Sequence, residues 1–264
     1  SSDTKKLNVF GWDSTNPLFG GTGSGSSDSS TAIGILQSLK DAGYETNESL
    51  TKMYTDYRAD RPTIAMAQQD WTLPEPTKEY YTDSLMDEAK EYSDTAVVVI
   101  GRSGGEGADL PTDMKSVIDG SYAKKAEEVS VSPDNYGYVK GRYTNNGDYD
   151  FDEGESYLEL SNTEEDMLDT VCSQFDNVIV VVNANNAMEL DWVDKYEQIG
   201  AVIFAPGAGA TGFEALGEII NGSVNPSGKT VDTFVKDLTE TPYYNNMGLN
   251  AYTNVEDLKE QIAA

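Results

Sequence analysis

The sequence predicts an α/β fold, a three-layer sandwich in which a mainly parallel, about six-stranded sheet is covered by helices on both faces. Uninterrupted apolar runs at 96–100, 178–182 and 201–205 are typical of strands buried on both faces of a parallel sheet. Segments with helical spacing lie between these runs, and turn residues bound them. This alternation of strand and helix along 264 residues indicates one doubly covered sheet.

The first part of the chain has the pattern of a βαβ unit. Residues 6–12 make the first expected strand, and a loop rich in glycine and serine follows at 16–30. Ile33, Leu36 and Leu39 repeat at helical spacing and predict a helix. We expect this helix to begin after a serine cap at 29 or 30 and to end at Gly43, where a second strand begins.

The remaining elements follow the same alternation. Expected helices lie at 50–58, around 85–89, at 163–175, around 192–196 and at 209–220; expected strands lie at 96–100, 177–183, 201–205 and, as a last edge strand, 231–235. Residues 59–80 are expected to form an irregular surface excursion, and the charged, turn-rich stretch 111–154 an insertion at the ligand edge of the sheet. With no repeat and no linker, residues 1–264 are expected to form a single domain.

Composition excludes several functional classes. The net charge is −28, from 46 acidic and 18 basic residues, so we expect no nucleic-acid partner and no membrane-surface partner. No apolar run reaches the length of about 18 residues that a membrane span needs. The chain has no histidine, which excludes a Ser-His-Asp triad and histidine metal sites. Neutral ligands such as sugars suit a site of carboxylates, tyrosines and tryptophans.

The one cysteine, Cys172, cannot form an intrachain disulfide or a zinc site of several thiolates. Its apolar neighbours at helical spacing predict a buried core thiol. A lone cysteine leaves the compartment open, and a secreted or cell-surface location is favoured over a cytoplasmic one.

Glu106 is the leading candidate for chemistry. The apolar run 96–100 ends at Gly101, and a loop with further glycines at 104, 105 and 107 carries this one carboxylate. In open α/β sheets, ligands bind outside the carboxyl ends of the strands. Glu106 is therefore expected at the edge where such folds do chemistry; the alternative is a solvated turn residue.

Three other stretches resemble known ligand-binding motifs. The glycine loop at 21–25 lacks the third glycine of a dinucleotide fingerprint, and 222–230 has the wrong spacing for a phosphate loop, so no nucleotide cofactor is expected. The acidic stretch 148–159 has oxygen ligands at several positions of a calcium loop but Glu153 where glycine is required. A solvated acidic turn is the preferred interpretation, and no metal site is expected.

Three motifs together resemble the C-terminal α/β-sandwich domain of glycoside hydrolase family 3, the β-glucosidase and β-xylosidase family. They are the buried strand leading into Gly104-Gly105-Glu106-Gly107-Ala108-Asp109, the loop Gly20-Gly21-Thr22-Gly23-Ser24-Gly25, and Pro206-Gly207 with the later Asn221-Gly222 and Asn225-Pro226-Ser227-Gly228-Lys229. These motifs occur in the family's order and, with the buried strands between them, span nearly the whole chain. The insertion at about 111–154 is longer than is usual in the family.

The resemblance implies a specific division of labour. Family members are retaining enzymes in which a (β/α)8-type barrel domain of the same protein supplies the nucleophilic aspartate and the sandwich domain lends the general acid/base glutamate. Glu106 matches that glutamate, Ser24 matches a position that contacts the sugar, and Asp109 is the matching aspartate of the motif and a candidate substrate ligand. The carbohydrate substrate would bind between the two domains.

This sequence departs from the family pattern at several positions, and these departures leave the identity of the acid/base residue open. Leu110 stands where the family usually has arginine, and Glu153 or Glu155 of the insertion is an alternative acid/base. In the family the nucleophilic aspartate lies in a Ser-Asp-Trp-like motif. Trp71 and Trp192 follow aspartates, but as Gln69-Asp70-Trp71 and Leu190-Asp191-Trp192, so neither matches this motif and the catalytic barrel domain is expected to be absent from these residues. The sequence thus predicts the sandwich domain of a retaining, β-glucosidase-like bacterial glycosidase of carbohydrate metabolism, inactive alone. The alternative is a non-catalytic carbohydrate-binding or interdomain scaffold domain.

Overall fold

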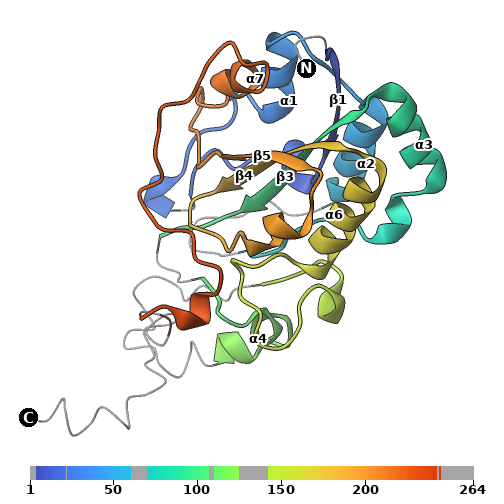
Figure 1. The fold of residues 1–264 in the computed structure, drawn as a ribbon. Helices are drawn as coiled ribbons and strands as arrows, with labels where there is room; N and C mark the ends of the chain where they lie inside the picture. The colour runs from blue at the N-terminus through green and yellow to red at the C-terminus, as the bar shows by residue number, and fades with distance from the viewer. Residues whose placement is uncertain are drawn as a thin grey trace, which may run out of the picture.

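A computed structural model describes residues 4–21, 23–60, 70–106, 110–124, 142–242 and 244. Its centre is a five-stranded, all-parallel sheet in the order β2-β1-β3-β4-β5 (Figure 1). The strands are β1 (Lys6–Phe10), β2 (Glu45–Thr46), β3 (Thr95–Arg102), β4 (Asn177–Ala184) and β5 (Ile199–Phe204). β3 and β4 pair along their whole length, from Thr95 with Asn177 to Arg102 with Ala184.

Helices cover both faces of the sheet, which confirms the predicted sandwich. The α-helices are α1 (Ile35–Asp41), α2 (Glu48–Arg58), α3 (Asp83–Tyr92), α4 (Met114–Ile118), α6 (Asn162–Gln174) and α7 (Glu214–Ile220). Short 3-10 helices are η1 (Trp12–Ser14), η2 (Gly23–Gly25), η3 (Lys78–Tyr80), η4 (Gly147–Tyr149), η5 (Asp191–Lys195) and η6 (Leu238–Glu240). No helix among these described segments is long and apolar enough to cross a bilayer.

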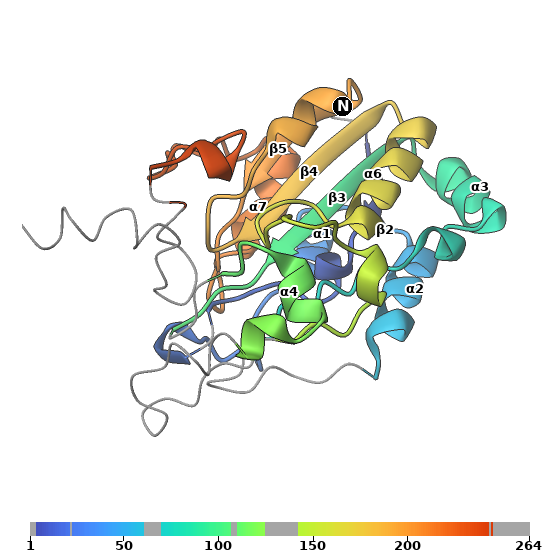
Figure 2. The same cartoon turned by 90° about the horizontal axis from the view of Figure 1, so that it is seen from below.

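The alternation of side chains along the central strands builds two cores. Val97, Val99 and Val181 pack with α1 and α7 on one face. Val98 and Val180 pack with α2, α3 and α6 on the other. Figure 2 shows β5, β4 and β3 side by side, with α6 lying along one face. Both faces of β3 and β4 are therefore covered by helices, which is why their sequences are continuous apolar runs.

Three expectations about elements are wrong. The segment 231–235 is not the expected edge strand, and Val231 is 97% exposed; the described residues form a sheet of five strands, close to the expected number. Helices α1 and α7 begin later than expected, and Gly34, not a serine, caps α1. The segment 59–80 is not all surface: Trp71 is completely buried in the core on the α2, α3 and α6 face.

Other expectations are confirmed. The predicted helix 163–175 is α6, which begins with a full capping box between Ser161 and Glu164. Cys172, on α6, is a buried free thiol, as predicted. The expected insertion 111–154 stays a prediction: its described residues, 111–124 and 142–154, hold α4 and η4 and form no strand.

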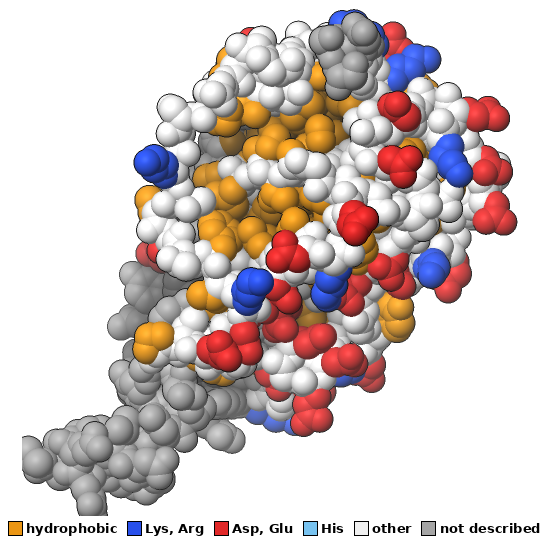
Figure 3. Space-filling view, in the orientation of Figure 1, with side chains coloured by type: hydrophobic (Ala, Val, Ile, Leu, Met, Phe, Trp, Pro, Cys, Tyr) orange, Lys and Arg blue, Asp and Glu red, His pale blue; other side chains and the backbone are white. Residues whose placement is uncertain are grey.

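The edge strand β5 exposes apolar side chains. Ala201 and Val202 are exposed, and Ile203 is half-buried. Figure 3 shows apolar side chains gathered in this region, where Figure 1 draws β5 and its neighbours, while acidic side chains are scattered over the rest of the same view.

Candidate active site

Four loops meet at the carboxyl ends of the strands. They follow β1, β3, β4 and β5, and glycines make their close approach possible. A Cβ atom on Gly21 would lie 3.0 Å from the Gly104 carbonyl oxygen, and one on Gly207 would lie 3.1 Å from Gly20 Cα. One on Gly104 would lie 2.8 Å from the Asn186 side-chain nitrogen. The two glycine motifs that the sequence singled out are therefore in contact with each other.

Glu106 takes part in the contact between these two glycine motifs. Its carboxylate Oε2 accepts a hydrogen bond of 2.7 Å from the backbone N–H of Ser24, in the glycine loop. Both residues are exposed. Hydrogen bonds from the side chain and the backbone of Ser24 lower the pKa of Glu106 below its ordinary value. In this arrangement Glu106 is ionised at neutral pH.

Two of the three predicted site residues, Glu106 and Ser24, are thus adjacent. The third, Asp109, lies outside the described residues. The alternative acid/base Glu155 is in a separate turn, where its Oε2 accepts a hydrogen bond of 2.5 Å from the Asp152 N–H. Glu153 is exposed.

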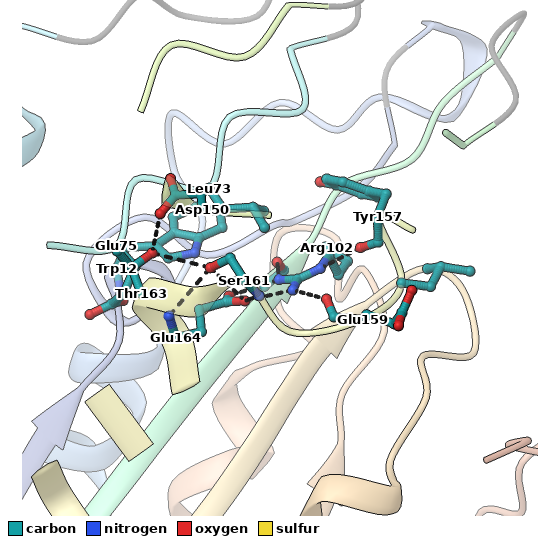
Figure 4. A network of polar contacts seen from close by, with 12 residues as sticks. Trp12, Leu73, Glu75, Arg102, Asp150, Tyr157, Glu159, Ser161, Thr163 and Glu164 are labelled. Carbon is teal, nitrogen blue, oxygen red and sulfur yellow. Dashed lines mark hydrogen bonds and ion pairs between the residues drawn. The ribbon is translucent and has the colours of Figure 1, made fainter. Parts of the chain in front are cut away.

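Beneath the exposed loop, Arg102 anchors the end of β3. Its guanidinium is completely buried and forms a two-pronged ion pair with Glu164, at 2.8 Å and 2.6 Å. Its remaining N–H groups donate to the carbonyl oxygens of Gly101, Tyr157 and Glu159. Figure 4 shows Arg102 between Glu164 on α6 and the chain at 157–159. All five donors of the guanidinium therefore have acceptors.

The same network reaches the next residue. The Tyr157 hydroxyl lies 3.0 Å from both the backbone N and the hydroxyl of Ser103. Buried polar groups therefore fix the start of the loop at Arg102 and Ser103. The Glu106 carboxylate is instead held by the Ser24 N–H of the glycine loop.

Asparagines at the end of β4 and directly after it organise the neighbouring loops. Asn183 is buried, and its side-chain oxygen accepts a hydrogen bond from the Leu18 N–H. Its side-chain nitrogen donates to the carbonyl oxygens of Leu18 and Ala205. Asn185 Oδ1 accepts from the Gly207 N–H at 2.9 Å. Sequence reasoning missed these residues, although the run Asn183-Ala184-Asn185-Asn186 directly follows a buried strand at the same edge, which is the available signal.

A second missed residue is Asp13, just after β1. It is fully buried, and neither carboxylate oxygen has a hydrogen-bond partner among the described residues. A Cβ atom on Gly101 would lie 2.6 Å from this carboxylate, so Asp13 packs directly on β3. Burial raises the pKa of Asp13 well above its usual value, because it penalises the charged form of the carboxyl group.

The other candidate motifs have local roles. Asp150, in the acidic stretch weighed for calcium, accepts hydrogen bonds from Tyr143, Asn145 and Thr163. Within the described ranges, no group of three His, Cys, Asp or Glu side chains could hold a metal ion. The glycine-lysine stretch 222–229 is exposed and follows α7 rather than a strand. A groove of about 780 Å³ lies beside β2, lined by Tyr44, Glu48 and Tyr92 among others, and contains none of the predicted site residues.

The chain is similar in sequence to part of several β-glucosidases. It is 30% identical over 191 residues to β-glucosidase A of Butyrivibrio fibrisolvens, covering 72% of this chain and 20% of the relative. It is 27% identical over 238 residues to a β-glucosidase of Ruminococcus albus, covering 89% of this chain and 20% of the relative. The chain thus spans about a fifth of the length of these two relatives.

Solved structures share the fold. A β-glucosidase from Paenibacillus barengoltzii superposes with a TM-score of 0.69 at 26% identity, covering 92% of this chain and 22% of that one. For β-glucosidase 3B from Thermotoga neapolitana the TM-score is 0.66 at 24% identity, covering 93% of this chain and 29% of that one. The model of the glycosyl hydrolase family 3 C-terminal domain matches residues 1–261. This chain therefore belongs to the glycosyl hydrolase family 3 C-terminal domain family.

Proposed function

We propose that this domain serves a retaining, β-glucosidase-like hydrolase by supplying its general acid/base, Glu106. The observation that carries the proposal is the contact between Glu106 and the Ser24 loop at the carboxyl edge of the sheet. Membership of the family supports a glycosidase context. The nucleophilic aspartate would come from a (β/α)8-type barrel domain of the same protein, so the chain alone is expected to be inactive.

A retaining mechanism needs the Glu106 carboxyl group protonated in its first step and ionised in its second. In the first step Glu106 gives its proton to the glycosidic oxygen as the C–O bond breaks and the nucleophile's carboxylate bonds to the anomeric carbon. In the second step the Glu106 carboxylate takes a proton from the water that attacks this carbon, and the nucleophile leaves. Retaining pairs lie about 5 Å apart, which requires the barrel to close over Glu106.

The exposed state of Glu106 is suited to the second step only. Its pKa is lowered by Ser24, whereas a general acid needs a raised pKa. Closure of the barrel would remove water from the carboxylate, and desolvation raises the pKa of an acid. The sugar would bind in the same closed space, with Ser24 and Asp109 as the proposed substrate contacts.

The test uses the full-length enzyme with Glu106→Ala and aryl β-glucosides whose leaving groups differ in acidity. A poor leaving group needs protonation, so its kcat/KM is expected to fall by about 100-fold or more, and the kcat/KM of a good leaving group far less. With a good leaving group kcat is expected to fall, because the second step has lost its base. Azide is expected to restore part of the activity by replacing water, because it needs no base. The matched control is Glu155→Ala, and the assignment fails if this variant shows these effects and Glu106→Ala does not.

The lowered pKa of Glu106 also favours a second candidate, a non-catalytic carbohydrate-binding or scaffold domain. In that case Glu106→Ala leaves kcat unchanged for every leaving group. A neutral sugar would then bind the Ser24 and Glu106 edge with an affinity that Glu106→Ala reduces. Isothermal titration with glucose and with a β-linked disaccharide measures this alternative directly.

A further inference from the structure

Few side chains of the described residues pack against the Glu106 side chain. It is exposed, and the preceding Gly104 and Gly105 offer no side chains to pack against it. A free glutamate of this kind samples many rotamers, and fixing it costs conformational entropy. The 2.7 Å bond from the Ser24 N–H to Oε2 is a charge-assisted hydrogen bond, which opposes that freedom.

Gly23 makes this bond possible. Its φ is +82°, in the region that side chains disfavour, and a Cβ atom there would lie 2.6 Å from Glu106 Cβ and 3.0 Å from Oε2. Any other residue at 23 would push the glutamate away from the Ser24 N–H. Gly25 differs: a Cβ atom there would meet nothing within 4 Å.

The glycine loop that carries these groups is itself closed. The Gly21 N–H donates to the Gly25 carbonyl at 3.0 Å, and the Ser26 N–H donates to the Gly23 carbonyl at 3.0 Å. The loop also contacts the Glu106 loop a second time, where Gly21 lies against the Gly104 carbonyl. The Ser24 N–H is therefore presented from a defined turn.

We propose that Gly23 and the backbone N–H of Ser24 are positioning groups that hold the Glu106 carboxylate in place for its role as the base of the second step. This inference rests on the proposed function of Glu106. It gives the glycine loop a task besides contact with the sugar. The N–H bonds the charged form of the carboxyl, which is the form that accepts the proton from water. Among the described residues, the Ser24 groups lower the pKa of Glu106 and slight burial raises it.

The kinetic test compares Gly23→Ala with the control Gly25→Ala in the full-length enzyme. For a substrate with a good leaving group, hydrolysis of the glycosyl-enzyme limits kcat, and Gly23→Ala is expected to lower kcat by about 10-fold to 100-fold. Azide is expected to restore part of this loss in Gly23→Ala, because it attacks without a base. Gly25→Ala is expected to keep the azide response and leaving-group dependence of the wild type, and equal kcat losses in both variants would overturn the inference.

A titration of the 264-residue chain tests the contact without any activity. The ¹³C carboxyl shift of Glu106 is expected to titrate below the ordinary glutamate range in the wild type and in Gly25→Ala, and within that range in Gly23→Ala. In the wild type the Ser24 amide proton is expected to shift with the same midpoint, and Glu106→Gln is expected to abolish this shift. The amide measurement does not depend on the folding of Gly23→Ala.

The two tests separate the inference from the function it rests on. If the Ser24 amide does not follow Glu106, the positioning contact is wrong whatever the kinetics show. If the amide follows Glu106 but Glu106→Ala shows no leaving-group dependence and no azide rescue, the proposed acid/base role fails, and with it the catalytic meaning of the contact.

Discussion

Arg102 and Glu164 illustrate how single residues stabilise the base of the site. Both side chains are fully buried, and every N–H of the guanidinium has an acceptor. The Glu164 carboxylate additionally accepts from the Ser161 N–H at 2.9 Å. Removing one partner of such a pair leaves a buried charge without compensation, which is more costly than the pair is stabilising.

Arg102→Met is therefore expected to reduce the free energy of unfolding by about 3–5 kcal/mol. Urea unfolding followed by circular dichroism measures the change. The control is Lys52→Met, which removes an exposed i,i+4 pair with Asp56 and is expected to cost about 0.5 kcal/mol or less. Equal losses in the two variants would contradict the role assigned to the buried pair.

Glu75 is the buried carboxyl group with the clearest pH consequence. Oε1 accepts hydrogen bonds from the Tyr54 and Tyr81 hydroxyls, and Oε2 accepts one from the Trp12 N–H at 2.9 Å. Burial raises the pKa of Glu75 from 4.5 to about 8 in spite of these bonds. Between these two pH values the folded state holds a proton that the unfolded state has lost, so stability falls as pH rises.

Glu75→Gln is expected to flatten this fall between pH 5 and 8, by at most about 1.4 kcal/mol per pH unit. Urea midpoints at pH 5.0, 6.5 and 8.0 measure the slope. Asp13 and Glu189, whose pKa values burial also raises, add to the wild-type slope, so the comparison with Glu75→Gln isolates one group. Glu79→Gln, at an exposed position, is expected to keep the wild-type slope.

At the scale of elements, the sequence predicted what is local and missed what depends on distant partners. The central strands were visible because burial on both faces demands an unbroken apolar run. The segment 231–235 has the composition of a strand but no pairing partner, so it forms none. Trp71 is buried in a segment without periodicity, between prolines, and only its tertiary contacts reveal this.

The site followed the same rule. Glu106 could be selected as a candidate because its loop follows a strand at the ligand edge, and its pairing with the glycine loop came from the family resemblance; its catalytic role stays a proposal. Arg102 was not predicted, because its partner Glu164 is on α6, far along the chain, and nothing in either neighbourhood signals the pair. Asp109 stays a prediction.

The capping box of α6 gives a prediction for a whole helix. Ser161 Oγ accepts from the Glu164 N–H, and the Glu164 side chain accepts from the Ser161 N–H. Ser161→Ala is expected to cost about 1 kcal/mol in the free energy of unfolding, because it removes the cap while leaving the ion pair with Arg102. Ser173→Ala, in the last turn of α6 and exposed, is the control; urea unfolding of both variants decides whether the cap contributes.

At the scale of the whole molecule, charge is the dominant surface property. A net charge of −28 on 264 residues makes the folded state repel itself, because compaction brings like charges together. Raising NaCl from 10 to 200 mM shortens the screening length from about 30 Å to below 10 Å, and Tm is expected to rise. Differential scanning fluorimetry measures this, and KCl at the same ionic strength is expected to act equally. A Tm that does not change with salt would show that the acidic groups are too far apart to interact.

The strand order has a consequence for how the chain folds. β1 lies between β2 and β3, and Asn8 pairs with Ala96 while Phe10 pairs with Val98. β1 is therefore made long before β3, and until β3 emerges only the two-residue strand β2 is there to pair with it. Pairings so distant along the chain have high contact order and form slowly. The sheet is expected to assemble as one late event after β3 and β4 emerge, which makes the nascent chain a natural substrate for chaperones that shield apolar strands.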